Sequence, residues 1–342
     1  MADVTAQGSQ ARLLGYACIV SSALLFGVAG TVAKLLFVDS MPPLVMIALR
    51  AVVASATLAL VMAALRKPIR IRRADAPFLL ELGVWLTLVN VTFFYAIALT
   101  NVALALMLEY TAPMLIVAAG VILGTHRLNR PVVLILAGNA AGCFLLVGGY
   151  DPALWSGNAL GAAVGLLCAV SFAAYNVRCA DGHRRGLDSW SMTFWPFFLS
   201  ALFWLLATPA IDYSAVEFSW GVVGFTLFVG VFGTVVPYWL YLEGLRTIDP
   251  FPATVVGMLD PVFAGLTAYA LLGERFDPPQ VAGMALVCAV IVYLKRNEAA
   301  VNQCTARGCA GPPSQPPPIF DGGRGFGRGE AEFPPPSKMG EG

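Results

Sequence analysis

Long apolar runs alternate with short polar stretches along most of the chain. A helix needs about 20 apolar residues to cross the hydrocarbon core of a bilayer, with a range of roughly 17–25. Ten segments approach or meet this length, and we expect each to be a membrane-spanning helix. They are residues 13–37, 44–64, 77–98, 101–123, 131–149, 158–178, 189–208, 220–242, 252–272 and 279–294. The pattern predicts an all-α integral membrane protein.

The composition supports the same class. Of 342 residues, 58% are hydrophobic and 12% are charged, whereas a soluble domain carries about 25% charged residues. The net charge of +1 gives no basic field for a nucleic-acid partner. The seven cysteines form no CxxC pair, and we interpret those in apolar runs as small buried hydrophobes. No cofactor or metal site is expected, and the lipid bilayer is the expected environment.

The loop charges predict how the spans are oriented, because Lys and Arg near span ends stay cytoplasmic. With the N-terminus inside, the inner side holds fourteen cations and the outer side holds Arg275 alone. The fourteen are Arg12, Arg66, Lys67, Arg70, Arg72, Arg73, Arg127, Arg130, Arg178, Arg184, Arg185, Arg246, Lys295 and Arg296. We therefore expect both termini to be cytoplasmic. Residues 1–12 form the N-terminal segment, and residues 297–342, rich in Pro and Gly, are expected to be a disordered cytoplasmic tail.

Two proline-containing segments indicate an internal repeat. A shift of 148 residues places LEYTAPMLIVAAGVILGTHR (108–127) on VGMLDPVFAGLTAYALLGER (256–275) and superposes Pro113 on Pro261. Each segment follows an aromatic-rich span. The repeat divides the chain into residues 13–150 and 151–296, with five spans each. Since five is odd, the second copy enters the membrane from the opposite side, an arrangement typical of secondary transporters.

Several of these stretches resemble the EamA-type family of the drug/metabolite transporter superfamily. They are PLVMIALR (43–50), FFYAIALTNVALALMLEYTAPMLIVAAGVILGTHRL (93–128) and LDPVFAGLTAYALLGERF (259–276). The likeness covers all ten spans; one departure is Gly124-Thr125-His126-Arg127, where the family usually has Gly-Glu-Arg. It implies ten helices, N-in and C-in, around a central cavity, with the fifth and tenth spans packed outside. It also implies efflux of amino acids, other metabolites or drugs.

Two acids lie inside apolar spans beside prolines. An acid at the centre of a spanning helix costs about 2.5–3.5 kcal/mol on insertion scales. Asp260 precedes Pro261 in the ninth span, and Glu109 lies four residues before Pro113 in the fourth. Such helix breaks persist only where they face protein or a watery cavity. One interpretation is that both acids line a substrate or proton pathway; the alternative is a structural cap or hydrogen bond.

Other polar residues inside spans are candidates for the same pathway. Arg50 is two turns inside its span and is expected to pair with an acid or with carbonyls, or to hold a substrate carboxylate. Lys34 is a candidate too, with snorkelling to the interface as the alternative. Asn90 and Asn176 are buried amides, which also serve as contacts between helices. Phe94 lies four residues after Asn90 and shares its face.

Aromatic residues near a proline complete the candidates. Tyr238 and Trp239 follow Pro237, which is expected to kink the eighth span, and Tyr95 lies in the third. Walls of this kind accept apolar or aromatic solutes. Helix packing and an interfacial aromatic belt are the alternatives.

The sequence thus predicts a secondary transporter that exports a small metabolite such as an amino acid by alternating access. The alternatives are a carrier for cationic drugs and a non-transporting membrane scaffold. An enzyme is not expected, because no catalytic motif is present and both histidines fall in predicted loops. The predicted location is the bacterial inner membrane. Substrate identity, proton or ion coupling and oligomeric state stay open.

Overall fold

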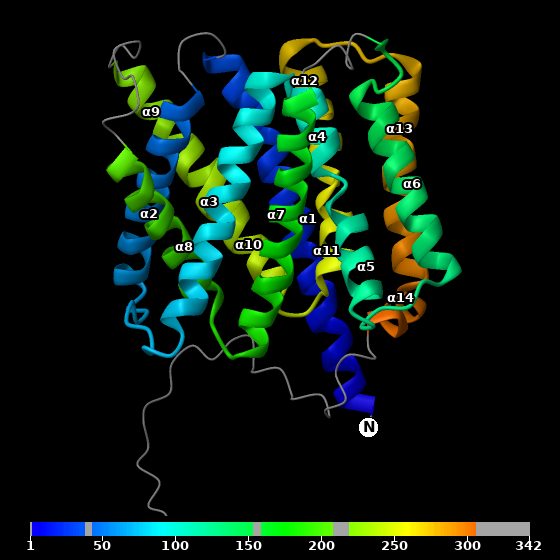
Figure 1. Cartoon of the computed structure of the whole chain (residues 1–342), viewed down its shortest axis with the longest axis horizontal. Coiled ribbons are helices and arrows are strands. Elements are labelled where there is room, and N and C mark those ends of the chain that lie inside the picture. The colour runs from blue at the N-terminus through cyan, green and yellow to red at the C-terminus, as the bar shows by residue number, and fades with distance from the viewer. Residues whose placement is uncertain (1, 38–42, 153–158, 208–218, 306–342) are drawn as a thin grey trace, which may run out of the picture. The chain divides into compact units, whose positions relative to one another are not determined.

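The computed structural model describes residues 2–37, 43–152, 159–207 and 219–305. These residues form helices and connecting loops, without a strand (Figure 1). The helices are α1 (Ala2–Phe37), α2 (Pro43–Ala64), α3 (Ala76–Leu99), α4 (Val102–Glu109), α5 (Ala112–Ile122), α6 (Arg130–Val147), α7 (Ala159–Arg184), α8 (Ser189–Ala207), α9 (Trp220–Gly230), η3 (Val231–Val235), α10 (Val236–Gly244), α11 (Pro250–Gly257), α12 (Leu259–Leu272), α13 (Pro278–Arg296) and α14 (Glu298–Thr305). They provide ten segments long and apolar enough to cross a membrane, which confirms the predicted spans.

Three of the ten spans are interrupted, and a proline follows each interruption. Span four divides into α4 and α5 just before Pro113, and span nine divides into α11 and α12 just before Pro261. Span eight contains the π-helix η3 immediately before Pro237. A proline lacks the N–H that would bond the carbonyl one turn earlier, so it frees a backbone acceptor. At Pro237 the structure shows a local change of helix type, and the kink expected there stays a prediction.

The two halves repeat each other in detail. The helices α4 and α11 each have eight residues, and their starts are 148 residues apart. The helices α6 and α13 start with the same spacing. The equivalent residues Asn101 and Asp249 precede α4 and α11. The repeat predicted from two prolines therefore extends to the helix boundaries, and five spans per copy make it inverted.

The helices gather into two groups that mix the halves. The first bundle contains α3, α4, α5 and α7, in which α7 packs along the other three. The second bundle contains α1, α10, α11 and α12, in which α1 packs along the other three. Each bundle thus takes its long central helix from the opposite half. The helix pair α2–α8 packs beside these bundles, and so does the pair α6–α13, as expected for the fifth and tenth spans.

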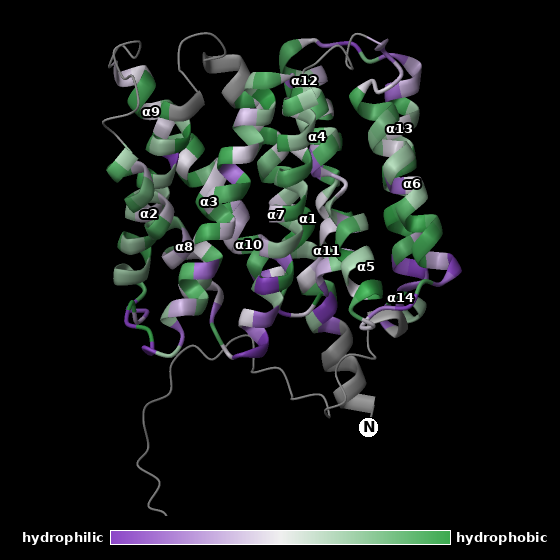
Figure 2. Cartoon of the chain, viewed as in Figure 1, coloured by the Kyte–Doolittle hydropathy of each residue, from purple (hydrophilic) through white to green (hydrophobic). Residues whose placement is uncertain are grey.

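The polar residues are concentrated at the helix ends, whereas the middles of the helices are mostly apolar (Figure 2). We call the end at which α1 begins and α13 ends the terminal face. A disordered tail was expected from residue 297, but Glu298–Thr305 forms the helix α14 on this face. Glu298 pairs with Arg12 at 2.7 Å, and Asn129 Nδ2 donates to the Ala300 carbonyl at 2.8 Å. Residues 306–342 lie outside the described part of the chain.

The helices α6 and α13 cross at two glycines, which yields a stability prediction. A methyl group at Gly283 would lie 2.7 Å from the Gly142 carbonyl oxygen, whereas one at Gly224 would meet nothing within 4 Å. Overpacking of this kind typically costs about 1–3 kcal/mol. We expect Gly283→Ala to lower the thermal unfolding temperature of the purified protein and Gly224→Ala to leave it unchanged or raise it. Equal melting temperatures for the two variants would contradict a close α6–α13 crossing.

Candidate functional site

The two broken spans meet in the interior. Tyr110 follows α4 and Met258 follows α11, so the two residues occupy equivalent positions in the repeat. Both pack in one apolar cluster with Cys143, Val262 and neighbours from α6 and α13. The breaks of the two halves are therefore neighbours inside the protein, and their loosened backbone faces protein rather than lipid.

The breaks bring Glu109 and Asp260 close to each other. Glu109 is the last residue of α4, and Asp260 is the second residue of α12. The two carboxyl groups interact electrostatically, and the Tyr110 hydroxyl lies within hydrogen-bonding reach of Asp260. Protein surrounds both acids, yet part of each remains accessible to solvent.

Arg50 lies on α2 and is held by two side chains of α3. Its guanidinium donates to Asn90 Oδ1 and lies 5.7 Å from the centroid of the Phe94 ring. Asn90 Nδ2 in turn donates to the Leu86 carbonyl at 2.8 Å, which fixes the direction of the amide. Of the expected partners, Arg50 meets a carbonyl oxygen, that of the Asn90 amide, and an aromatic face lies beside it. An amide orients the guanidinium without neutralising it, so the positive charge stays available.

Tyr238 connects Arg50 with the acids. Its ring contacts Phe26 and Phe197 edge to face, with centroids 5.3 and 5.0 Å apart. Its hydroxyl interacts electrostatically with both Arg50 and Glu109. One side of the site thus carries a positive group, the other carries two carboxyl groups, and aromatic rings lie between them.

The remaining candidates are more dispersed. Trp239 packs against Trp190 with ring centroids 4.9 Å apart. Asn176 is fully buried and donates to the Phe172 carbonyl at 2.8 Å. Tyr95 is 48% exposed, so its ring faces the surroundings of the helices. Lys34 belongs to α1, but its side chain lies outside the described part of the structure.

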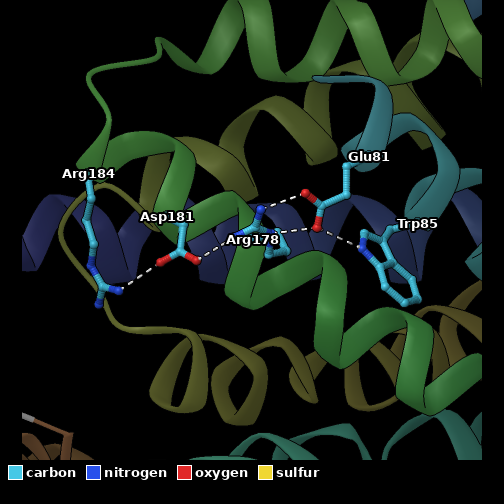
Figure 3. Close-up of polar contacts among 5 residues, drawn as sticks. All are labelled: Glu81, Trp85, Arg178, Asp181 and Arg184. Atoms are coloured by element: carbon cyan, nitrogen blue, oxygen red, sulfur yellow. Dashed lines mark hydrogen bonds and ion pairs between the residues drawn. The ribbon is translucent and has the colours of Figure 1, made fainter. Parts of the chain in front are cut away.

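One charged network escaped the sequence analysis. Arg178 of α7 forms a two-pronged pair with Glu81 of α3, with both N–O distances at 2.6 Å (Figure 3). Asp181 bridges Arg178 at 3.2 Å and Arg184 at 3.0 Å, and Trp85 Nε1 donates to Glu81 at 3.4 Å. Glu81 carries the same signal as Glu109, since it is an acid within a predicted span. Its partner could not be inferred, because Arg178 was predicted only as a cation at the inner end of the sixth span, with no helix named opposite it.

This network clamps α3 to α7 and continues toward the second bundle. Two parallel hydrogen bonds between a guanidinium and a carboxylate fix both distance and angle. Arg178 also lies over the Phe78 ring at 4.8 Å, which adds a second contact to α3. Arg184 Nη2 lies 3.8 Å from Asp249, the residue that precedes α11. The first bundle is therefore held internally by a strong pair and touches the second by a weaker one.

The fold and the site define a multi-pass membrane carrier built from two inverted five-helix repeats. The sequence pattern of the EamA-like transporter family matches residues 13–148 and 159–295. The chain therefore belongs to the EamA-like transporter family, and the resemblance seen in the motifs is confirmed.

Curated relatives and a solved structure agree with this placement. An uncharacterized transporter of Archaeoglobus fulgidus is 26% identical over 221 residues, which is 64% of this chain and 76% of that protein. The uncharacterized inner membrane transporter YicL of Salmonella typhimurium is 26% identical over 60% of this chain and 68% of its own. The uncharacterized transporter YwfM of Bacillus subtilis is 24% identical over 79% and 89%. A crystal structure with 19% identity superposes with a TM-score of 0.67 over 84% of this chain and 98% of its own, which supports the fold.

The clamp between α3 and α7 gives a second stability prediction. Glu81 and Arg178 are partly exposed, so water screens their attraction and the pair contributes about 0.5–1 kcal/mol. We expect Glu81→Gln to lower the thermal unfolding temperature by a few degrees. The swapped double variant Glu81→Arg/Arg178→Glu should recover part of this loss. A single variant as stable as the wild type would show that the pair adds nothing to stability.

Proposed function

We propose that the chain is a secondary transporter that exports amino acids or closely related, partly apolar metabolites by alternating access. Family membership establishes transport at the coarse level. The finer proposal is supported by one observation: Arg50, Glu109 and Asp260 lie inside spanning helices of different parts of the chain, and each is only partly exposed.

The arrangement of charges favours a zwitterion. The positive charge of Arg50 is not compensated by Asn90, because Asn90 is neutral. The free N–H groups of Arg50 therefore suit a substrate carboxylate. Glu109 and Asp260 suit a substrate ammonium group, and in its absence protons can balance their charge. The rings of Phe94 and Tyr238 offer apolar surface for a side chain. A cationic drug would use the acids and rings, but it would gain nothing from Arg50.

The architecture supplies a route for alternating exposure. The halves are inverted copies, and each bundle exchanges its central helix with the other half. Two such bundles can tilt about a site at their interface, so that the site faces one side of the membrane at a time. A non-transporting scaffold would have no use for charges at this depth, each of which costs free energy to bury. Export, rather than import, rests on the family resemblance alone.

Counterflow in proteoliposomes tests the substrate class. We expect the wild type to exchange radiolabelled apolar or aromatic amino acids and to discriminate against their amides, which lack the carboxylate. Arg50→Gln should remove this discrimination and lower amino-acid exchange at least about tenfold, the effect of losing a charged hydrogen bond. Tyr269→Phe, on the exposed surface of α12, is the matched control. Equal transport of amino acids and amides by the wild type would contradict a role for Arg50 in carboxylate binding.

The acid pair gives a separate test. Glu109→Gln and Asp260→Asn remove one negative charge each with little change in shape. We expect either variant to slow amino-acid exchange at least about tenfold and to change how the rate depends on pH between 5 and 9. If both variants retained the wild-type rate and pH profile, the acids would be structural only. Exchange of cationic dyes that survives Arg50→Gln but is lost in Asp260→Asn would instead support the cationic-drug alternative.

A further inference from the structure

The two bundles contact each other unequally at their two ends. Near the terminal face, α11 of the second bundle packs against α5 and α7 of the first. The inverted repeat makes α4–α12 and α4–α1 the equivalent pairs near the opposite face. No comparable packing joins those pairs in the described part of the chain. In the described part of the chain, the bundles therefore pack together more closely at the terminal face than at the other.

A polar seam runs between the bundles on the closed side. Tyr175, Cys179 and His183 lie four residues apart on α7, so they form one stripe on that helix. Tyr241 and Leu242 of α10 lie opposite. His183 Nε2 is 2.8 Å from the Leu242 carbonyl oxygen, and the Tyr175, Tyr241 and Cys179 groups interact with one another.

This seam is poorly suited to be a permanent interface. The Tyr175 and Tyr241 hydroxyls are buried without a hydrogen-bond partner among the described residues, although Tyr175 lies beside the Cys179 thiol. A buried hydroxyl left unpaired costs about 1–3 kcal/mol, and apolar side chains would avoid that cost. Polar groups in this position are explained if water enters the seam in another conformation of the protein and forms hydrogen bonds with them.

The position of the seam connects it to the candidate site. Tyr238 lies on α10 one turn before Tyr241 and interacts with Arg50 and Glu109. From there the polar groups continue to His183, near the end of α7, and to the Arg184–Asp249 contact at the terminal face. The polar groups of the seam therefore extend from the region of Tyr238 toward the terminal face.

We propose that the α7–α10 seam is the closed gate of the carrier on its terminal face, latched by His183 on the Leu242 carbonyl, and that it parts to form the second half of the translocation path. This proposal rests on the proposed transport function. In the parted state, Tyr175, Cys179 and Tyr241 line the path, and their polar groups are hydrated.

Cys179 provides a native reporter for the gate. Single-cysteine proteins that retain only Cys179 or only Cys168 are purified, reconstituted and treated with N-ethylmaleimide, and the mass increase is followed over time. Both thiols are fully buried on α7, but Cys168 donates to the Val89 carbonyl of α3, in its own bundle. We expect slow labelling at Cys179 and slower or no labelling at Cys168.

Variants at His183 decide whether the latch acts as proposed. Loss of one ordinary hydrogen bond shifts an opening equilibrium about fivefold. We expect His183→Ala to speed Cys179 labelling about fivefold without affecting Cys168, and His183→Gln, which keeps a donor, to restore the slow rate. Unchanged labelling of Cys179 in His183→Ala, or equal acceleration at both cysteines, would overturn the gate.

A functional readout separates this proposal from the proposed substrate. Labelled Cys179-only protein should lose amino-acid counterflow, whereas labelled Cys168-only protein should keep it. Amino-acid exchange that persists after complete Cys179 modification would overturn the gate and leave the transport assignment standing. Latch-dependent labelling in a protein that exchanges no amino acid would support the gate and contradict the substrate class.

Discussion

The hydrocarbon core of a bilayer offers no partner to a backbone N–H or C=O, and the rest of the structure depends on this constraint. Pro113, Pro237 and Pro261 each interrupt a spanning helix and free a carbonyl. Such breaks are tolerated only where other helices or water surround them. The two equivalent breaks consequently pack in one cluster in the interior, and each has an acid beside it. The requirement for internal hydrogen bonding thus places the polar groups that a carrier needs.

The same constraint explains what could be predicted from the sequence. Spans can be recognised in the sequence because the thickness of the hydrocarbon core sets their length. All ten were predicted close to their observed limits. The inverted repeat followed from Pro113 and Pro261 and from the odd number of spans. Asn90 and Phe94 were expected on one face, and both contact Arg50. The helix α14 was missed because eight amphipathic residues are hidden in the average composition of a Pro/Gly-rich segment.

What could not be predicted depends on which helices pack together. Helical periodicity places a residue on a face, but it does not name the helix opposite. Arg50 was expected beside an acid or carbonyls, but nothing in the sequence singled out Asn90 of α3, whose amide oxygen accepts its hydrogen bond. His183 appeared to be a loop residue and instead bonds a carbonyl of α10. The exchange of α1 and α7 between the bundles likewise has no local signal, because it arises from contacts between residues far apart in the sequence.

This exchange has a consequence for how the protein is made. The helix α1 emerges first from the ribosome. Its packing partners α10, α11 and α12 belong to the last third of the spans and are synthesised late. The nascent chain must hold its first helix in the membrane without those neighbours until nearly all the others have been inserted. Neither half can complete a bundle on its own, so assembly waits for the ninth span and stalled or truncated chains expose an unmatched first helix.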